Sequence, residues 1–320
     1  MAVSIFVLQQ PARYVNTHDT GNHGTLGAAF NMKTNYDTVV IGGGPAGSQC
    51  VLWLTKLGLD ACMVEPSEIG GLQARSPYTN SWLSVVQATT SAKQVAQNIA
   101  ANVSSQGCIV HRINCDKINY SDQFGVFTVH SGDQRIEAKN VVIATGTKER
   151  TGGLKLTNQV LGLVGAFSME CLGLRVAIIG GGDASCEAYQ LAKEKAAKDV
   201  KIFARNVRAR SSLWDAIPVA DKYVGVYAAS DSKIDHRGGS YDFDIICICY
   251  GWEAVVPELG FNIDTNDIGR IVVDKSMQTS LPGLYAIGDN NDASYPCVAT
   301  AISDGVCAAK SIERFMNEYF

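Results

Sequence analysis

Short apolar runs, each closed by a glycine-rich turn, recur along the chain. The β-branched run at residues 37–41 predicts a buried parallel strand, and the glycine turn after it opens a helix that should extend to Gly58. A second apolar run at residues 59–64 ends at Glu65. Periodicity further predicts a helix over residues 91–107 and an antiparallel strand over residues 124–129.

The same order of elements returns later in the chain. Residues 175–179 form another apolar run, Gly180-Gly181-Gly182 follows it, and residues 187–195 should be helical. The apolar runs 141–146 and 245–251 take corresponding places in the two halves. This internal repeat predicts an α/β protein with two Rossmann-like nucleotide-binding units and two nucleotide sites that face one another.

The first glycine turn has the spacing of a dinucleotide site. In Gly42-x-Gly44-x-x-Gly47, two glycines make the turn and admit a pyrophosphate, and the third lets the helix close on the strand. Glu65 stands near the expected distance for a carboxylate that binds a ribose hydroxyl. An ordinary strand–helix turn is the alternative.

Length and composition narrow the class. A chain of 320 residues with 46% hydrophobic and 18% charged residues predicts two globular domains, and a net charge of −4 gives no reason to expect a nucleic-acid partner. Its ten cysteines include no C-x-x-C, so neither a zinc site nor a thioredoxin-type redox pair is expected. We find no signal peptide and no bilayer-spanning run, and therefore expect a cytoplasmic protein in a reducing compartment.

Together these landmarks resemble the two-domain flavoprotein disulfide reductases, and among them the short thioredoxin reductases. The likeness covers residues 36–315 and rests on Gly42 to Gly47, Glu65, residues 70–73, Ala144-Thr145-Gly146, Gly180 to Gly182 and Gly288-Asp289. It implies a three-layer ββα fold in each domain and an FAD-binding domain formed by residues 36–148 and 251–320. A shortened pyridine-nucleotide domain, residues 149–250, is then inserted, and residues 1–35 form a flexible extension.

The resemblance also implies where cofactors bind. Glu65 would hold the adenosine ribose, Asp289 the ribityl and phosphate region, and the helix that begins at residues 297–300 would point at the flavin pyrimidine edge. The full set of residues expected at the first site is Gly42, Gly44, Pro45, Ala46, Gly47, Glu65, Gly71, Gln73, Ala144, Thr145, Gly146, Gly288, Asp289, Cys297 and Val298. The set expected at the second site is Gly180, Gly182, Asp183, Ala184 and Arg205. No metal is expected.

Three departures from the thioredoxin reductases qualify this interpretation. The redox C-x-x-C is missing, the His-Arg-Arg pattern for the NADPH 2′-phosphate is replaced around Arg205, Arg208 and Arg210, and residues 211–244 look loop-rich where the family has strands. One branch, the diflavin-linked disulfide oxidoreductases of oxygenic photosynthetic prokaryotes, resembles the chain more closely. That branch implies a second FAD where NADPH would sit, so NADPH is not expected as the donor.

Exchange between thiols and flavin needs two sulfurs that can pair. Cys247 and Cys249 are the leading candidates, because they end the last strand of the inserted unit and project to the same face. Their Cα atoms should lie roughly 6.5–7 Å apart, at the limit for a disulfide. Packing in a strand core is the alternative, and Cys297 is a second candidate for flavin contact.

We therefore predict an FAD-dependent disulfide oxidoreductase, homodimeric by family likeness, whose partner is a redox protein or a small dithiol or disulfide. A membrane-associated acceptor, with the protein peripheral at a membrane, stays open. Two other functions also remain: an NAD(P)H-dependent ferredoxin or flavin reductase without a redox disulfide, and a non-catalytic flavin-binding sensor.

Overall fold

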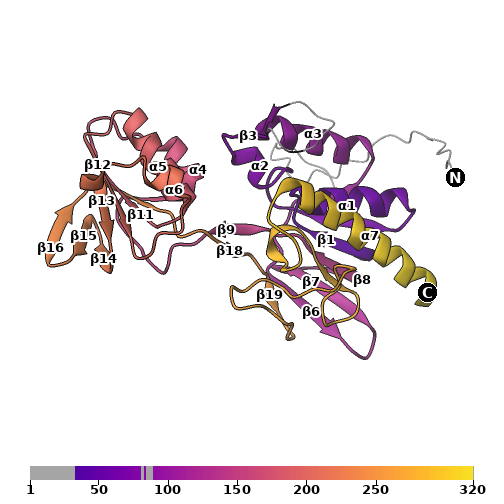
Figure 1. Ribbon diagram of the computed structural model, residues 1–320. Coiled ribbons are helices and arrows are strands. Elements are labelled where there is room, and N and C mark those ends of the chain that lie inside the picture. The colour runs from indigo at the N-terminus through magenta and orange to yellow at the C-terminus, as the bar shows by residue number, and fades with distance from the viewer. Residues whose placement is uncertain (1–32, 81–82, 84–88, 320) are drawn as a thin grey trace, which may run out of the picture. The chain divides into compact units, whose positions relative to one another are not determined.

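The chain forms two compact units (Figure 1). The computed structural model describes residues 33–80, 83 and 89–319, so nearly all of the predicted extension 1–35 lies outside the described residues. Of the described residues, those up to Thr147 and from Ala254 onward form unit 1, and Lys148–Glu253 form unit 2. The architecture is the predicted α/β fold with two Rossmann-like units.

Unit 1 is built on a parallel sheet whose central strand is β1. This strand pairs in parallel with β2 on one side and with β8 on the other. The C-terminal half of β8 also pairs with β20, and β2 pairs with β5. The bounds are β1 (Asn35–Ile41), β2 (Ala61–Val64), β5 (Ile109–His111), β8 (Gln134–Ile143) and β20 (Leu284–Ala286).

Helices cover one face of this sheet, and α1 and α7 lie side by side on it (Figure 1). A fully buried apolar cluster fills the space between, with Leu54 of α1, Val40 and Met63 of the sheet and Ile312 of α7. The bounds are α1 (Pro45–Lys56), α2 (Leu72–Arg75), α3 (Ala92–Ser105), α7 (Val298–Tyr319) and the short 3-10 turn η2 (Gly288–Asn290).

An antiparallel meander covers the opposite face. β8 pairs with β7 along its first half before it enters the parallel sheet, and Phe127 of the meander packs into one core with Val39 and Val141. This gives the three-layer arrangement. The remaining strands of unit 1 and of its connection to unit 2 are β3 (Thr79–Asn80), β4 (Thr90–Ser91), β6 (Lys117–Ser121), β7 (Val126–Ser131), β9 (Thr147–Glu149), β18 (Trp252–Ala254) and β19 (Glu258–Leu259).

Unit 2 repeats these layers on a five-stranded parallel sheet of order β10-β17-β11-β12-β13. Helices α4 and α5 pack on one face through a buried cluster that includes Ile178 and Tyr189, and a second cluster around Phe203 fills the other face. The bounds are β10 (Gln159–Leu161), α4 (Gly162–Ser168), β11 (Arg175–Ile179), α5 (Asp183–Glu194), β12 (Asp199–Ala204), α6 (Ser211–Trp214), η1 (Val219–Asp221), β13 (Lys222–Val224) and β17 (Ile245–Ile248).

The expectation that residues 211–244 are loop-rich is wrong. Besides β13, they contain the antiparallel sheet of β14 (Tyr227–Ser230), β15 (Lys233–His236) and β16 (Gly239–Asp242). Each strand is only four residues long, and the tight turns place Asp231 and Arg237 at φ of 46° and 49°. Side chains still alternate between buried and exposed along β15, so the strands cover the core below them.

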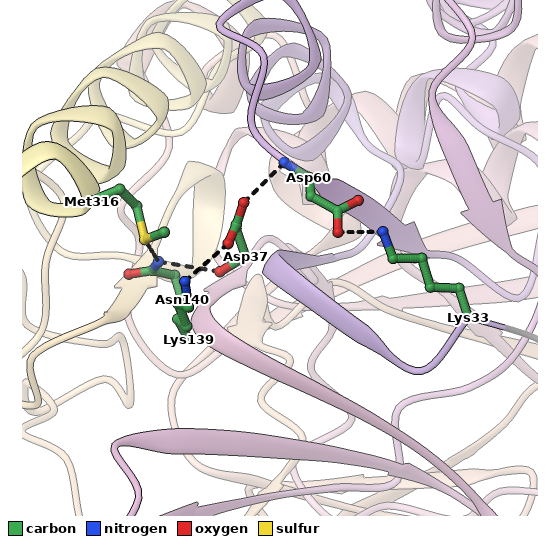
Figure 2. A network of polar contacts seen from close by, with 6 residues as sticks. All are labelled: Lys33, Asp37, Asp60, Lys139, Asn140 and Met316. Atoms are coloured by element: carbon green, nitrogen blue, oxygen red, sulfur yellow. Dashed lines mark hydrogen bonds and ion pairs between the residues drawn. The ribbon is translucent and has the colours of Figure 1, made fainter. Parts of the chain in front are cut away.

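A polar network fastens the start of β1 to its neighbours (Figure 2). Asp37 accepts hydrogen bonds from the Asp60 amide (3.2 Å) and from Lys139 Nζ (3.3 Å). Asn140 Nδ2 donates to the Asp37 carbonyl (3.2 Å) and contacts the sulfur of Met316 (3.3 Å). The network ties the amino ends of β1 and β2 to the middle of β8 and to α7, at the opposite end of β1 from the glycine turn.

None of the helices in the described part of the chain combines the length and apolar character needed to cross a membrane. The same residues bring together no group of three His, Cys, Asp or Glu side chains that could hold a metal ion.

Candidate functional site

The first glycine turn is packed so tightly that two of its positions exclude any side chain. A Cβ on Gly42, which has a φ of 109°, would lie 2.3 Å from the carbonyl oxygen of Ala144. A Cβ on Gly47 would lie 2.0 Å from the carbonyl oxygen of Gly42. These contacts bring the first turn of α1 against the ends of β1 and β8, the role that the spacing predicts for these glycines.

Gly44 is different, because it faces open space. It is the N-cap of α1 with an ordinary φ of −70°, and a Cβ built on it meets nothing within 4 Å. Pro45 follows at the first helical position. A helix start with uncapped amides beside an open space suits a phosphate group.

Glu65 is joined to the turn by a hydrogen bond. The Gly43 amide donates to Glu65 Oε2 (2.7 Å), and the Ser67 amide donates to Oε1 (2.8 Å). The carboxylate is partly exposed at the end of β2, where it retains further acceptor capacity toward a hydroxyl.

A buried carboxylate holds the Gly288–Asp289 turn. Asp304 of α7 is 3% exposed and accepts hydrogen bonds from the Gly288 amide (3.1 Å), Asn291 Nδ2 (2.8 Å) and Ser294 Oγ (2.8 Å). Burial, together with the nearby Asp304 charge, raises the pKa of Asp289, which the Arg270 charge only partly offsets. Asp304 was not among the expected site residues. The sequence does contain one indication of its role, because it places an acidic residue on a helix face that otherwise consists of small apolar residues.

Cys297 is exposed and directly precedes α7. Its sulfur lies 3.2 Å from Thr300 Oγ1 and accepts from the Thr300 amide (3.5 Å). Burial acts to raise its pKa, but these hydrogen bonds and the Ala299 amide outweigh that effect and lower the pKa of the thiol below its ordinary value. The sequence placed Thr300 in the segment that begins the helix, but it gave no sign that this residue would contact the thiol of Cys297.

These features border one cavity of about 760 Å³ in unit 1. Its volume lies in the range of roughly 300–1,000 Å³ usual for ligand sites. The expected residues that line it are Gly42, Gly44, Pro45, Ala46, Glu65, Gly71, Gln73, Ala144, Thr145, Gly146, Gly288, Asp289, Cys297 and Val298, whereas Gly47 lies beneath it. An open helix N-terminus in the middle, Glu65 at one side and the start of α7 at the other fit a dinucleotide such as FAD.

Unit 2 reproduces the backbone geometry of this turn. The Ala144 amide donates to the Ile41 carbonyl in unit 1, and the Cys249 amide donates to the Ile179 carbonyl in unit 2, both over 2.8 Å. A Cβ on Gly180 would lie 2.3 Å from the Cys249 carbonyl oxygen, as one on Gly42 would from that of Ala144. Cys249 is therefore the counterpart of Ala144, which lines the cavity of unit 1.

The two candidate redox sulfurs are close together. Cys247 Sγ and Cys249 Sγ lie 3.7 Å apart, both as free thiols, on the face of β17 that packs against α4 and α5. The hydrogen bond with Cys249 and deep burial raise the pKa of the Cys247 thiol well above its ordinary value. To form a disulfide, the two sulfurs would have to approach from 3.7 Å to about 2.0 Å.

The position that Glu65 takes in unit 1 is occupied by a different kind of residue in unit 2. By strand register Val64 corresponds to Phe203, so Ala204 takes the place of Glu65. Arg205 follows it and is exposed, with its guanidinium 5.5 Å from the centre of the Tyr227 ring.

The remaining expected residues of the second site surround the start of α5. Gly182 is the N-cap, a Cβ on it meets nothing within 4 Å, and Ala184 lies in the first turn of the helix. Asp183 is engaged by Arg210, whose amide and Nε each donate to the carboxylate over 2.8 Å. The second turn is thus open, but no carboxylate follows β12 there.

Comparison with known proteins agrees with this architecture. Over 305 residues the chain is 23% identical to a thioredoxin reductase of Listeria monocytogenes, covering 88% of this chain and 94% of that protein. It is 25% identical over 309 residues to a ferredoxin–NADP reductase of Lactococcus lactis, covering 87% and 94%. The crystal structure of T. acidophilum thioredoxin reductase superposes with a TM-score of 0.72 at 22% identity, covering 89% of this chain and all of that one. A model of the pyridine nucleotide-disulphide oxidoreductases matches residues 36–305, and the chain belongs to that family.

Proposed function

We propose that the protein is an FAD-dependent disulfide oxidoreductase in which the cavity of unit 1 binds FAD and the thiols of Cys247 and Cys249 exchange electrons with flavin. The observation that carries the proposal is the 3.7 Å separation of two sulfurs beside a repeated nucleotide turn. When bound, FAD supplies a two-electron acceptor and donor, and a dithiol–disulfide couple transfers the same number of electrons.

In unit 1 each residue has a separate task. The amides at the start of α1 bind the pyrophosphate, and Gly44 leaves the space it occupies. Glu65 fixes the turn through the Gly43 amide and accepts from the adenosine ribose. Asp289 binds the ribityl and phosphate region, while Cys297 and Val298 border the pyrimidine edge of the flavin.

In unit 2 the turn at Gly180 to Gly182 binds a second nucleotide, which we propose is FAD. The matched geometry of the two turns supports this: Cys249 makes the same backbone contacts with the turn of unit 2 as Ala144 makes with the turn of unit 1. A flavin bound at this turn would accept the electrons of the neighbouring dithiol, and a separate C-x-x-C would then not be needed.

A second function is favoured by a different observation. Ala204 replaces the carboxylate that Glu65 provides in unit 1, and the exposed Arg205 and Arg208 follow it. Guanidinium groups at the ribose end suit an additional phosphate. The alternative is therefore an NAD(P)H-dependent ferredoxin or flavin reductase without a redox disulfide, in keeping with the Lactococcus relative that is named ferredoxin–NADP reductase. A flavin-binding protein without turnover is the third possibility.

The proposed partner is a redox protein of the thioredoxin type or a small disulfide, in keeping with the relatives named thioredoxin reductase. We also propose a homodimer that acts in the cytoplasm, or peripherally at a membrane if its acceptor is membrane-associated.

A cofactor count separates these functions. FAD is released from purified holoprotein by denaturation and quantified against the chain, and a second sample is mixed anaerobically with NADPH or NADH. Two FAD per chain with slow or no bleaching supports the proposal, whereas one FAD bleached rapidly and stoichiometrically supports the alternative. One FAD that neither NADPH nor NADH reduces, and that dithiothreitol does not bleach in a third anaerobic sample, would point to a protein without turnover.

A further inference from the structure

The two sulfurs of the pair are not equally placed. Cys247 lies within β17, between β10 and β11, and is fully buried. Its thiol points to the Gly162 carbonyl at the start of α4 (3.7 Å). Cys249 lies one residue beyond the end of β17, is 7% exposed, and its sulfur is 3.9 Å from the Ala184 carbonyl in the first turn of α5.

Building on the proposed function, we propose that the pair divides its chemistry: Cys249 is the sulfur that attacks a low-molecular-weight disulfide, and Cys247 is the resolving sulfur. Only Cys249 presents any surface, since strands flank Cys247 on both sides and helices cover it. The small exposed area suits a slender small-molecule disulfide rather than a disulfide on the surface of a folded protein.

The exchange balances in two steps. The Cys249 thiolate attacks one sulfur of the substrate, R–S–S–R; the bond between Cys249 and S–R forms, the substrate S–S bond breaks, and one R–S⁻ leaves. The Cys247 sulfur, having lost its proton to solvent or to the departing thiolate, then attacks Cys249 Sγ and expels the second R–S⁻. The dithiol is oxidised to the Cys247–Cys249 disulfide, and the substrate is reduced to two thiols.

The local geometry favours this order. The sulfurs must approach from 3.7 Å to about 2.0 Å, and Cα atoms two apart in a strand lie near the upper limit for a disulfide. Cys247 is held in register between Val160 and Ile178, whereas Cys249 lies beyond both ladders and its amide is held by a single hydrogen bond to the Ile179 carbonyl (2.8 Å). Cys249 therefore supplies more of the movement. A substrate sulfur bound first to Cys247 would have to enter the core.

Trapping of the mixed disulfide tests the assignment. Wild-type holoprotein and the Cys247→Ser and Cys249→Ser variants are reduced with dithiothreitol, desalted anaerobically and exposed to bis(2-hydroxyethyl) disulfide. Tryptic residues 238–270 contain no cysteine other than these two, so each variant reports on one sulfur, separately from Cys297. As a control, each variant is also treated in denaturant, where the reagent should reach either sulfur. If a serine variant fails to fold, Cys247→Ala and Cys249→Ala replace it.

We expect Cys249 in Cys247→Ser to be modified at least about tenfold faster than Cys247 in Cys249→Ser. The wild-type peptide should lose two hydrogens and carry no adduct. The division of roles would be overturned by equal modification of the two sulfurs or by faster modification of Cys247. It would also be overturned if neither variant trapped an adduct while the wild-type peptide still formed its internal disulfide. In each case the proposal that the two cysteines form a redox pair would still stand. Absence of an internal disulfide in the wild type would instead reject the dithiol of the proposed function, and this inference with it.

Discussion

The amide nitrogen of Gly43 donates a hydrogen bond to Oε2 of Glu65 over 2.7 Å and so joins the first glycine turn to the end of β2. The same carboxylate accepts the Ser67 amide, which fixes its orientation at the cavity wall. One side chain thus shapes the turn and faces the space where the proposed cofactor binds.

Replacement of this carboxylate should weaken cofactor binding. In Glu65→Gln the charge-assisted bonds become neutral, and we expect FAD affinity to fall about tenfold to a hundredfold, equivalent to roughly 1.4–2.8 kcal/mol. Fluorescence of released FAD during dilution measures the change. The exposed Glu137→Gln is the charge-matched control, and equal affinities in both variants would exclude Glu65 from the site.

Two glycines of one turn should respond in opposite ways. A Cβ built on Gly44 meets no protein atom within 4 Å, and the residue has an ordinary φ. In Gly44→Val the apoprotein should therefore keep its thermal stability yet retain no FAD, because the side chain enters the cavity. Gly47→Ala places a Cβ 2.0 Å from the Gly42 carbonyl and should destabilise the apoprotein by about 1–3 kcal/mol. Thermal unfolding and flavin content separate the effects. A Gly44→Val protein that stays fully yellow would show that this turn does not hold the pyrophosphate.

The sequence was sufficient to place both glycine turns. At each tight backbone contact in such a turn only glycine fits, so the spacing of the glycines marks the turn in the sequence. The strands β14 to β16 escaped prediction because each is four residues long and the intervening turns lack the Asn-Gly or Asp-Gly pairs typical of hairpins. Asp304 escaped for another reason: its three partners come from a loop that packs against α7 only in the folded protein. The alternation rule did place Cys247 and Cys249 on one face, but not the 3.7 Å between their sulfurs.

Asp289 should make the apoprotein less stable as pH rises. Its pKa is raised from the ordinary 3.8, so the folded state binds more protons than the unfolded state between the two values. Its stabilising contribution is complete below the unfolded pKa and disappears as pH rises through the folded pKa. Asp289→Asn removes this dependence, and urea unfolding of apoprotein from pH 4 upward should show a stability gap that widens in favour of the variant. Parallel curves for the wild type and Asp289→Asn would contradict the assignment.

Cys297 should be alkylated faster than an ordinary thiol at neutral pH. Hydrogen bonds from Thr300 lower the pKa of its thiol. The rate at which the apoprotein reacts with iodoacetamide should therefore reach half its maximum at a pH below the pKa of an ordinary cysteine thiol. Thr300→Val removes the hydroxyl and should shift that midpoint upward, whereas Thr300→Ser should preserve it. Peptide mass spectrometry at Cys297 measures the rates. Coincident profiles for wild type and Thr300→Val would show that the hydroxyl does not stabilise the thiolate.

The most direct test of the central claim, that Cys247 and Cys249 exchange electrons with flavin, is an anaerobic dithiothreitol titration of the holoprotein followed by flavin absorbance. The wild type should bleach in proportion to added dithiol. Cys247→Ser and Cys249→Ser should each retain their flavin and fail to bleach, because neither remaining sulfur can complete the two-electron transfer. Bleaching of both variants at the wild-type rate and stoichiometry would contradict the account.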